Sequence, residues 1–81
     1  MTHVQRADRL RKLTGLDWTA AEKFHRASTP THTFKLKQEH DGGWTGVVIY
    51  RDHEYTLATK ENTFEKIAAW VTRQVQSGVT A

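Results

Sequence analysis

The sequence predicts an α+β protein in which helical segments flank a small antiparallel sheet. Two observations support this class. Apolar residues recur at helical spacing before Pro30, the only proline, and again after Asn62. Between these segments, short runs rich in β-branched and aromatic residues are separated by turn sequences. Because 81 residues are too few to bury two separate cores, we expect a single domain over residues 1–81.

Composition places the chain among globular proteins and excludes several kinds of site. Hydrophobic residues make up 37% of the chain and charged residues 26%, which is typical of a folded domain. No cysteine is present, so disulfides, thiolate zinc sites and cysteine nucleophiles are excluded. No apolar run approaches the roughly 20 residues that span a membrane, and the first residues carry no hydrophobic leader. We therefore expect a soluble, cytoplasmic protein.

The first 29 residues are predicted to form two short helices. Four apolar residues follow the helical period of the first helix: Val4, Ala7, Leu10 and Leu13. Gly15 stands where a residue in the left-handed conformation would end that helix. The second helix is expected to start at Asp17 or Thr19, because Thr19 and Glu22 have the spacing of a capping box. Its buried side would consist of four apolar residues: Ala20, Ala21, Phe24 and Ala27.

The middle of the chain is predicted to form a three-stranded antiparallel meander within residues 31–59. The expected strands are about 31–39, 44–51 and 55–59. Asp41 and Gly42 suit a two-residue hairpin loop, which would pair His40 with Gly43. This register sets four apolar side chains on one face of the sheet: Phe34, Leu36, Val47 and Ile49.

The second turn, around Asp52 and His53, leaves two alternatives open. A loop of three residues would add Tyr55 and Leu57 to the face that carries Phe34. A loop of two residues would place Tyr55 and Leu57 on the opposite face.

The last element is predicted to be a helix over residues 62–77. Asn62 and Glu65 have the spacing of a capping box, and Gly78 lies just past the expected end. Five apolar residues form its stripe: Phe64, Ile67, Ala68, Val71 and Val75. We expect this helix to cover the face that carries Phe34 and Val47.

The residues that commonly carry catalysis do not form a recognisable arrangement, so no enzyme, cofactor or metal site is expected. The five histidines are His3, His25, His32, His40 and His53, and no two have a metal-ligand spacing on a helix. The sequence contains no nucleophile elbow, phosphate-binding loop or dinucleotide fingerprint.

The second face of the predicted sheet combines basic and aromatic side chains. Lys35 and Lys37 would stand on the same side as Trp44, Val48 and Tyr50. Gly46 would lie between them, nearly opposite Lys37, and leave room for a partner to approach. Ammonium groups neutralise phosphates and aromatic rings stack on bases, so this face is typical of nucleic-acid binding. The alternatives are that the N-terminal helices cover this face as a second core, or that it docks on a protein.

Basic residues also gather near the N-terminus. The formal net charge is +3, and the first twelve residues carry four cations: Arg6, Arg9, Arg11 and Lys12. These side chains could hold phosphates. The segment from Leu13 to Leu16 partly matches a helix-turn-helix, but Arg11 stands where that motif requires a small buried residue. A plain helical hairpin packed on the sheet is therefore favoured.

Three stretches resemble known nucleic-acid-binding modules: the strand WTGVVIY, the turn RDHE and the helix bearing Ala68, Ala69 and Trp70. Together they resemble the arm-binding domains of tyrosine integrases and related AP2-type domains. That resemblance implies a three-stranded sheet laid into a DNA groove. The order α-β-β-β-α is also similar to that of the double-stranded RNA-binding domain, although KENTFEK replaces the basic run of that family.

We therefore expect a small, non-enzymatic nucleic-acid-binding protein of regulatory or mobile-element type, with DNA favoured over RNA. Lys35, Lys37, Trp44 and Tyr50 would form the sheet contact, and the N-terminal cations would hold phosphates. The alternative is a protein-interaction module, such as a phage-type inhibitor or adaptor, that docks its Trp/Val/Tyr face on a host protein. No membrane partner is expected.

Overall fold

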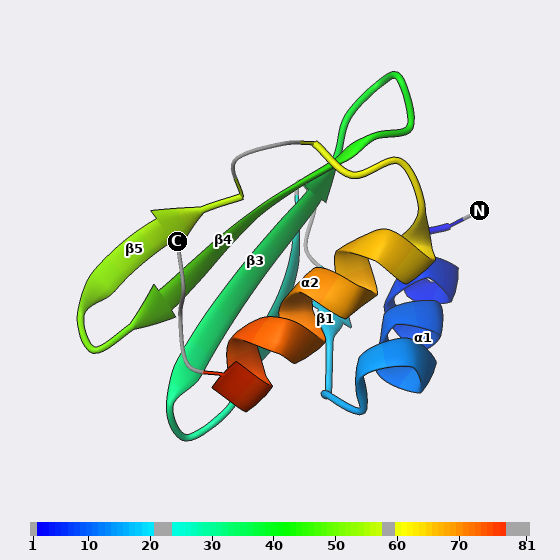
Figure 1. Ribbon diagram of the computed structural model, residues 1–81. Helices are drawn as coiled ribbons and strands as arrows, with labels where there is room; N and C mark the ends of the chain where they lie inside the picture. The colour runs from blue at the N-terminus through cyan, green and yellow to red at the C-terminus, as the bar shows by residue number, and fades with distance from the viewer. Residues whose placement is uncertain (1, 21–23, 58–59, 78–81) are drawn as a thin grey trace.

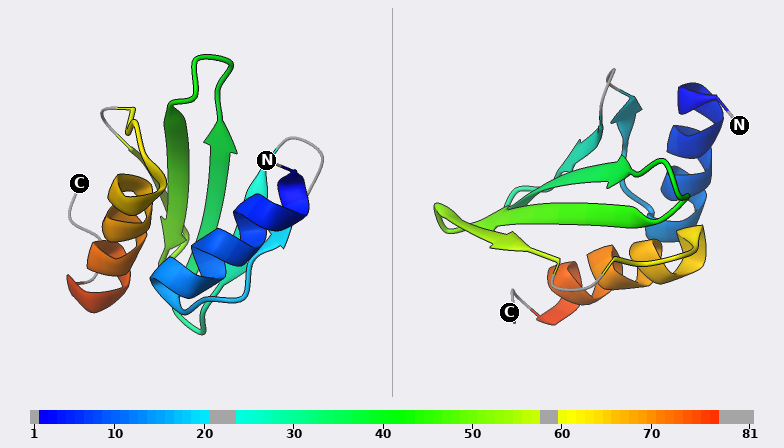
Figure 2. Two further views of the ribbon diagram at one scale, coloured as in Figure 1. Left: turned by 90° about the vertical axis from the view of Figure 1, so that its right-hand side faces the viewer. Right: turned by 90° about the horizontal axis from the view of Figure 1, so that it is seen from above.

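A computed structural model describes residues 2–20, 24–57 and 60–77. The elements in chain order are α1 (His3–Thr14), β1 (Thr19–Ala20), β2 (His25–Ser28), β3 (His32–Gln38), β4 (Trp44–Tyr50), β5 (His53–Thr56) and α2 (Phe64–Ser77). The strands form one antiparallel sheet in the order β1-β2-β3-β4-β5. Both helices lie on the same side of this sheet (Figures 1 and 2). The predicted α+β class is confirmed, but the sheet has five strands rather than three.

Helix α1 forms where the sequence predicts it. Its N-cap is Thr2, whose hydroxyl accepts a hydrogen bond from the Gln5 backbone, while the Gln5 side chain accepts one from the Thr2 N–H. Gly15 ends the helix with φ 76° and donates its N–H to the Arg11 carbonyl at 2.9 Å. The buried stripe is narrower than predicted, because Val4 remains 65% exposed.

The predicted second helix is wrong, because its described residues form strands β1 and β2. Strand β2 alternates strictly, with His25 and Ala27 buried and Arg26 and Ser28 exposed. This two-residue period was concealed in the sequence because a histidine occupies one of the two inward positions. Ala21 and Glu22, which were assigned to that helix, lie outside the described residues.

The hairpin between β3 and β4 differs from the predicted register by one residue. Its loop has three residues, since the Glu39 N–H donates to the Gly43 carbonyl at 2.7 Å and the Gly42 N–H donates to the Glu39 carbonyl at 2.9 Å. Gly42 adopts φ 86°, the left-handed conformation that this loop type requires. Leu36 consequently pairs with Gly46 instead of Val47.

A shift of one residue moves every side chain of β4 to the other face relative to β3. Trp44 and Val48 therefore join Phe34 and Leu36, whose side chains are all buried. Val47 and Ile49 instead share the opposite face with the two lysines of β3: Lys35 and Lys37. The predicted grouping of Phe34 and Leu36 with Val47 and Ile49 is wrong.

The loop of the hairpin between β4 and β5 has two residues, the shorter of the two predicted alternatives. Arg51 and Asp52 form it with φ values of 53° and 64°, as expected for a two-residue turn that follows the twist of the strands. Tyr50 pairs with His53, and Val48 with Tyr55. Tyr55 therefore lies on the buried side of the sheet with Val48. The end of the predicted third strand, at residues 58–59, lies outside the described residues.

Helix α2 covers the buried side of the sheet. It begins at Phe64, and the cap is Thr63, whose hydroxyl accepts the Lys66 N–H at 3.1 Å, instead of the predicted Asn62. Its buried residues are Ile67, Ala68, Trp70, Val71 and Gln74. The Trp70 ring meets the Phe34 ring edge-on, with centroids 6.2 Å apart. Val75 of the predicted stripe is instead partly exposed, and Gly78 lies outside the described residues.

One apolar core lies between the sheet and the two helices. Its largest fully buried side chains are Trp18, Trp44, Phe34, Leu10, Leu36, Ile67, Val48 and Val71. Helix α1 contributes Ala7 and Leu10 and packs against α2 as well as β1. The helices thus form one layer and the sheet the other, which leaves the far face of the sheet uncovered by any described helix (Figure 2).

Candidate functional site

The face that carries Trp44 and Val48 is the bed of the helices. Trp44 is 1% exposed, and its ring centroid lies 5.1 Å from that of Phe64 and 5.7 Å from that of His25. Val48 is fully buried. These residues belong to the single core under α1 and α2, so the alternative of a second core under two N-terminal helices is correct only in that helices cover this face. Trp44 and Val48 are thus inaccessible to a nucleic acid or to a host protein.

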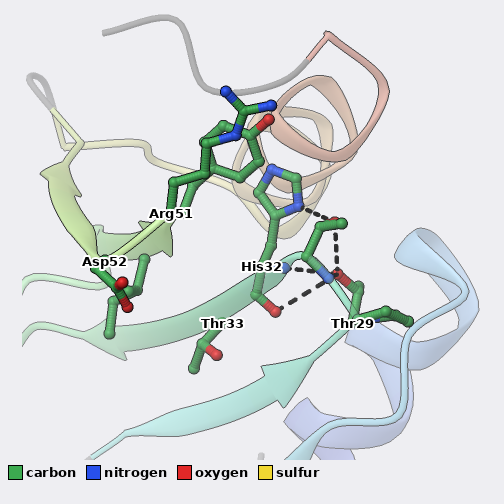
Figure 3. A pocket seen from close by; sticks show the side chains of 9 residues that line it. Thr29, His32, Thr33, Arg51 and Asp52 are labelled. Carbon is green, nitrogen blue, oxygen red and sulfur yellow. Dashed lines mark hydrogen bonds between the residues drawn. The ribbon is translucent and has the colours of Figure 1, made fainter.

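Tyr50 also points to the helix side of the sheet. Its ring stacks on His32, with centroids 4.6 Å apart and planes 18° apart, and the Arg51 guanidinium lies 5.1 Å from its centroid. Figure 3 shows His32 and Arg51 projecting to one side of the sheet and Thr33 to the other. Tyr50 is therefore held in an intramolecular stack and does not lie beside Lys35 and Lys37, as the sequence predicted.

The hollow beside Tyr50 and His32 is lined in part by the turn before β3, whose threonine hydroxyls form hydrogen bonds within the turn (Figure 3). The Thr29 hydroxyl accepts the N–H groups of Thr31 and His32 at 3.2 and 2.9 Å, and the Thr31 hydroxyl lies 2.7 Å from His32 Nδ1. Burial lowers the pKa of His32 below its usual value, which favours the neutral ring. The hydroxyls of Thr29 and Thr31 are thus engaged within the turn, so we assign the hollow a structural role.

The basic residues of α1 form a group separate from the sheet lysines. Arg9 pairs with Glu65 of α2 at 2.6 Å, and Arg11 pairs with Asp8 and Asp17. Backbone hydrogen bonding and the Arg9 guanidinium lower the pKa of Glu65. Arg11 also donates to the Trp18 carbonyl at 2.7 Å.

These pairs tie α1 to its neighbours and occupy two of the four cations predicted to hold phosphates. Of the other two, Arg6 is half-buried and Lys12 is exposed. Because α1 packs on the opposite side of the sheet from Lys35, one partner cannot lie flat on both groups.

The uncovered face of the sheet, called the open face below, brings together three exposed cations: Arg26, Lys35 and Lys37. Arg26 of β2 is directly opposite Lys35 of β3, and Lys37 lies two residues further along β3. Within the described ranges, none of the three forms an ion pair. Glu54 lies on the same face but on β5, at the edge of the sheet.

Apolar side chains accompany these cations on the open face. Phe24, Val47 and Ile49 are half-buried there, and the Lys35 Nζ atom lies 5.9 Å from the centroid of the Phe24 ring. A shallow depression of about 250 Å³ lies between Phe24, the two lysines of β3 and Val47. Sequence reasoning missed Arg26 and Phe24 because both fell within the wrongly predicted second helix.

Gly46 does not provide the room for a partner that the sequence predicted. Its missing side chain would point to the core, where a Cβ would lie 2.8 Å from Cζ3 of Trp70 and 2.9 Å from Cδ2 of Leu36. The Trp70 ring of α2 thus occupies the space above Gly46. Only its backbone borders the depression on the open face.

Two kinds of feature are absent from the described ranges. No group of three or more His, Asp or Glu side chains there is arranged to hold a metal ion. None of the helices in those ranges is long and apolar enough to cross a bilayer.

Comparison of the chain with protein-family models, with curated proteins and with solved structures finds no match in any of the three. The resemblance to integrase arm-binding, AP2-type and double-stranded RNA-binding modules stays a prediction, and the open face is interpreted from its own geometry.

Proposed function

We propose that the protein is a small, non-enzymatic nucleic-acid-binding protein whose contact surface is the open face. Arg26, Lys35 and Lys37 would bind phosphates there. The proposal rests on one observation: three exposed cations occupy neighbouring positions on the uncovered face and have no carboxylate partner among the described residues. Such cations can bind a polyanion without first breaking an ion pair to any described residue.

The mechanism is the release of counterions. Each phosphate neutralised by a lysine or arginine frees condensed cations from the nucleic acid, which drives binding at low salt. Three such contacts imply a slope of log K against log salt of about −2 to −3. Because phosphate contacts carry no information about the bases, the open face should bind by this electrostatic mechanism with little dependence on base sequence.

The proposal is tested by fluorescence anisotropy with labelled DNA and RNA oligonucleotides at about 50 and 200 mM salt. The double variant Lys35→Gln/Lys37→Gln should weaken binding at low salt by about 10-fold or more and should flatten the salt slope by about 2. Labelled oligonucleotides are required because Trp18, Trp44 and Trp70 are all buried, so their emission is a poor reporter of surface binding.

A matched control removes two exposed lysines from the helix layer. The variant Lys12→Gln/Lys66→Gln makes the same change in net charge on α1 and α2. It should leave the salt slope unchanged, since these residues lie on the other side of the molecule from the open face. Absence of binding at low salt, or an equal effect of both double variants, would contradict the proposal.

A second candidate is a protein-interaction module that uses the same open face. The half-exposed side chains of Val47 and Ile49 favour it, because apolar surface beside cations suits an acidic protein partner. A second copy of this chain fits less well, since two open faces would bring their own cations together. Capture of a partner that survives nuclease treatment and is lost in Ile49→Thr would favour this candidate over the first.

A further inference from the structure

We infer that the open face selects unpaired nucleotides over a duplex, with one base seated in the depression beside Phe24 and its neighbouring phosphates on Lys35 and Lys37. This inference rests on the proposed function and adds to it the structural class of the nucleic acid. It concerns single-stranded DNA and single-stranded RNA alike, because both present a base and a phosphate to the same site.

The depression has the form that a flat apolar group requires. Leu36 and Gly46 are paired across β3 and β4 and turn their side-chain positions to the core, so their backbones form the floor. Phe24 and Val47 border it with apolar surface. Its volume is about 250 Å³, and it is a shallow surface feature instead of an enclosed cavity. An aromatic ring at such a border provides a stacking surface for a base.

The cations stand where the backbone of a seated nucleotide would run. Lys35 and Lys37 occupy the same side of β3 two residues apart, which places their Cα atoms about 7 Å from each other. Arg26 lies across from Lys35 on the neighbouring strand. The Lys35 Nζ atom is 5.9 Å from the Phe24 ring centroid, so stacking and phosphate contacts are available to the same nucleotide.

A duplex cannot use these features together. Its bases are stacked in the interior, and the major groove, about 12 Å wide, admits a helix or a two-stranded ribbon. A sheet of five strands is about 19 Å from first to last strand, because neighbouring strands lie about 4.8 Å apart. The cations lie on β2 and β3, inside the sheet instead of on a protruding edge. A duplex would reach the lysines by its phosphates alone and leave the depression empty.

The test compares an oligothymidylate, an oligouridylate and a mixed-sequence DNA duplex, each of about 12 nucleotides or base pairs, by anisotropy at low salt. The intact protein should bind at least one single strand about 10-fold or more tightly than the duplex. Phe24→Leu keeps an apolar side chain but removes the ring, and it should weaken single-strand binding by about 10-fold while duplex binding is unchanged. Phe24→Trp should restore single-strand affinity, and its new tryptophan emission should be quenched on binding.

Leu13→Ala, a change of a partly exposed apolar residue on α1, serves as the control and should alter none of these affinities. Equal affinity for duplex and single strands would overturn the inference, as would a Phe24→Leu protein that binds single strands like the parent. Both results would leave the proposed function standing, provided that the Lys35/Lys37 variant still loses affinity. Absence of binding to all three probes would instead overturn the proposed function, and the inference with it.

Discussion

His32 shows how a single buried side chain links this fold to pH. It is 3% exposed, and its ring stacks on those of Phe34 and Tyr50, at centroid distances of 5.8 and 4.6 Å. Its Nδ1 atom bonds the Thr31 hydroxyl, while Nε2 has no partner within the described part of the chain. Burial disfavours the charged imidazolium and lowers the pKa of His32.

The free energy of unfolding should therefore fall as the solution is acidified. The unfolded chain takes up a proton at the ordinary histidine pKa of about 6.5, whereas the folded chain resists it. The contribution is fully present above that pH and is lost as the pH falls toward the lower pKa of the folded state. Denaturant unfolding at a series of pH values should show that the free energy of unfolding of the parent protein falls with pH. The contribution of His32 to this fall should be absent in His32→Phe, which keeps an aromatic ring in the stack.

His40→Asn is the control for this prediction, because His40 is exposed in the β3–β4 loop. It should keep the pH dependence of the parent. An unaltered pH dependence in His32→Phe would show that another group is responsible.

Gly46 is a second position where one side chain decides the packing. The variant Gly46→Ala places a Cβ within 3 Å of both Trp70 and Leu36, so the core must shift to admit it. Overpacking of this kind costs about 1–3 kcal/mol, so the melting temperature should drop by several degrees. Thr45→Ala, next to it in the chain and half-exposed on the open face, should have a much smaller effect. A Gly46→Ala protein as stable as the parent would contradict this packing.

At the scale of elements, α1, α2 and the strands β3, β4 and β5 are predictable from sequence because each has a local period and a local stop signal. The register of β4 is not. Trp44 and Val48 on one side and Val47 and Ile49 on the other give that strand two apolar faces, so hydrophobic pattern alone permits either orientation. The choice depends on whether the β3–β4 loop has two or three residues, and the sequence Asp41-Gly42-Gly43 suits both.

The same ambiguity limits what sequence reasoning recovers of the site. Lys35 and Lys37 were identified correctly as neighbours on one face, since side chains two apart on a strand always share a face. Their supposed companions Trp44 and Tyr50 were assigned to that face only through the wrong register. Arg26 joins them through pairing between β2 and β3, a contact that becomes visible only when the neighbouring strand is known.

The end of α1 depends on the left-handed backbone conformation of a single residue, Gly15. Gly15 has φ 76°, and apart from its chain neighbours nothing lies within 4 Å of the Cβ that a substitution would add, so the cost of a substitution comes from the backbone conformation. Gly15→Ala should lower the free energy of unfolding by about 1–2 kcal/mol. Gly15→Asn should cost less, because asparagine tolerates this conformation better. Equal losses for alanine and asparagine, measured by denaturant unfolding, would show that the backbone conformation is not the cause.

At the scale of the whole molecule, the two sides of the sheet are under different constraints. The helix side is packed, and Arg9 and Arg11 of α1 are paired there, whereas the open face holds like charges close together. Arg26 and Lys35 are directly opposed across two strands, an arrangement that destabilises a sheet. The proposed binding role of the open face would account for this cost, since function is often kept at the expense of stability.

Lys35→Gln should accordingly make the protein slightly more stable while it weakens nucleic-acid binding. The gain should be about 0.2–1 kcal/mol at low salt, because it relieves the repulsion from Arg26, and it should shrink at high salt, where surface charges are screened. Lys12→Gln, on α1, should give no such gain. Thermal unfolding at two salt concentrations measures both changes, and a loss of stability in Lys35→Gln would contradict this account of the open face.

The ion pair of Arg9 with Glu65 joins positions 56 residues apart, on the first and last described elements of the fold. The core aromatic residues Phe34 and Trp44 are enclosed only once α2 is in place. Contacts between distant parts of the sequence must therefore form before burial of these rings stabilises the fold. A chain emerging from the ribosome would expose these rings until Phe64 and the residues after it are synthesised. A chain stopped before Phe64 should therefore bind a hydrophobic dye, and a truncated chain that folds without doing so would contradict this dependence. Burial of the sheet thus awaits the synthesis of α2, and the surface that α2 later covers is the part most in need of a chaperone.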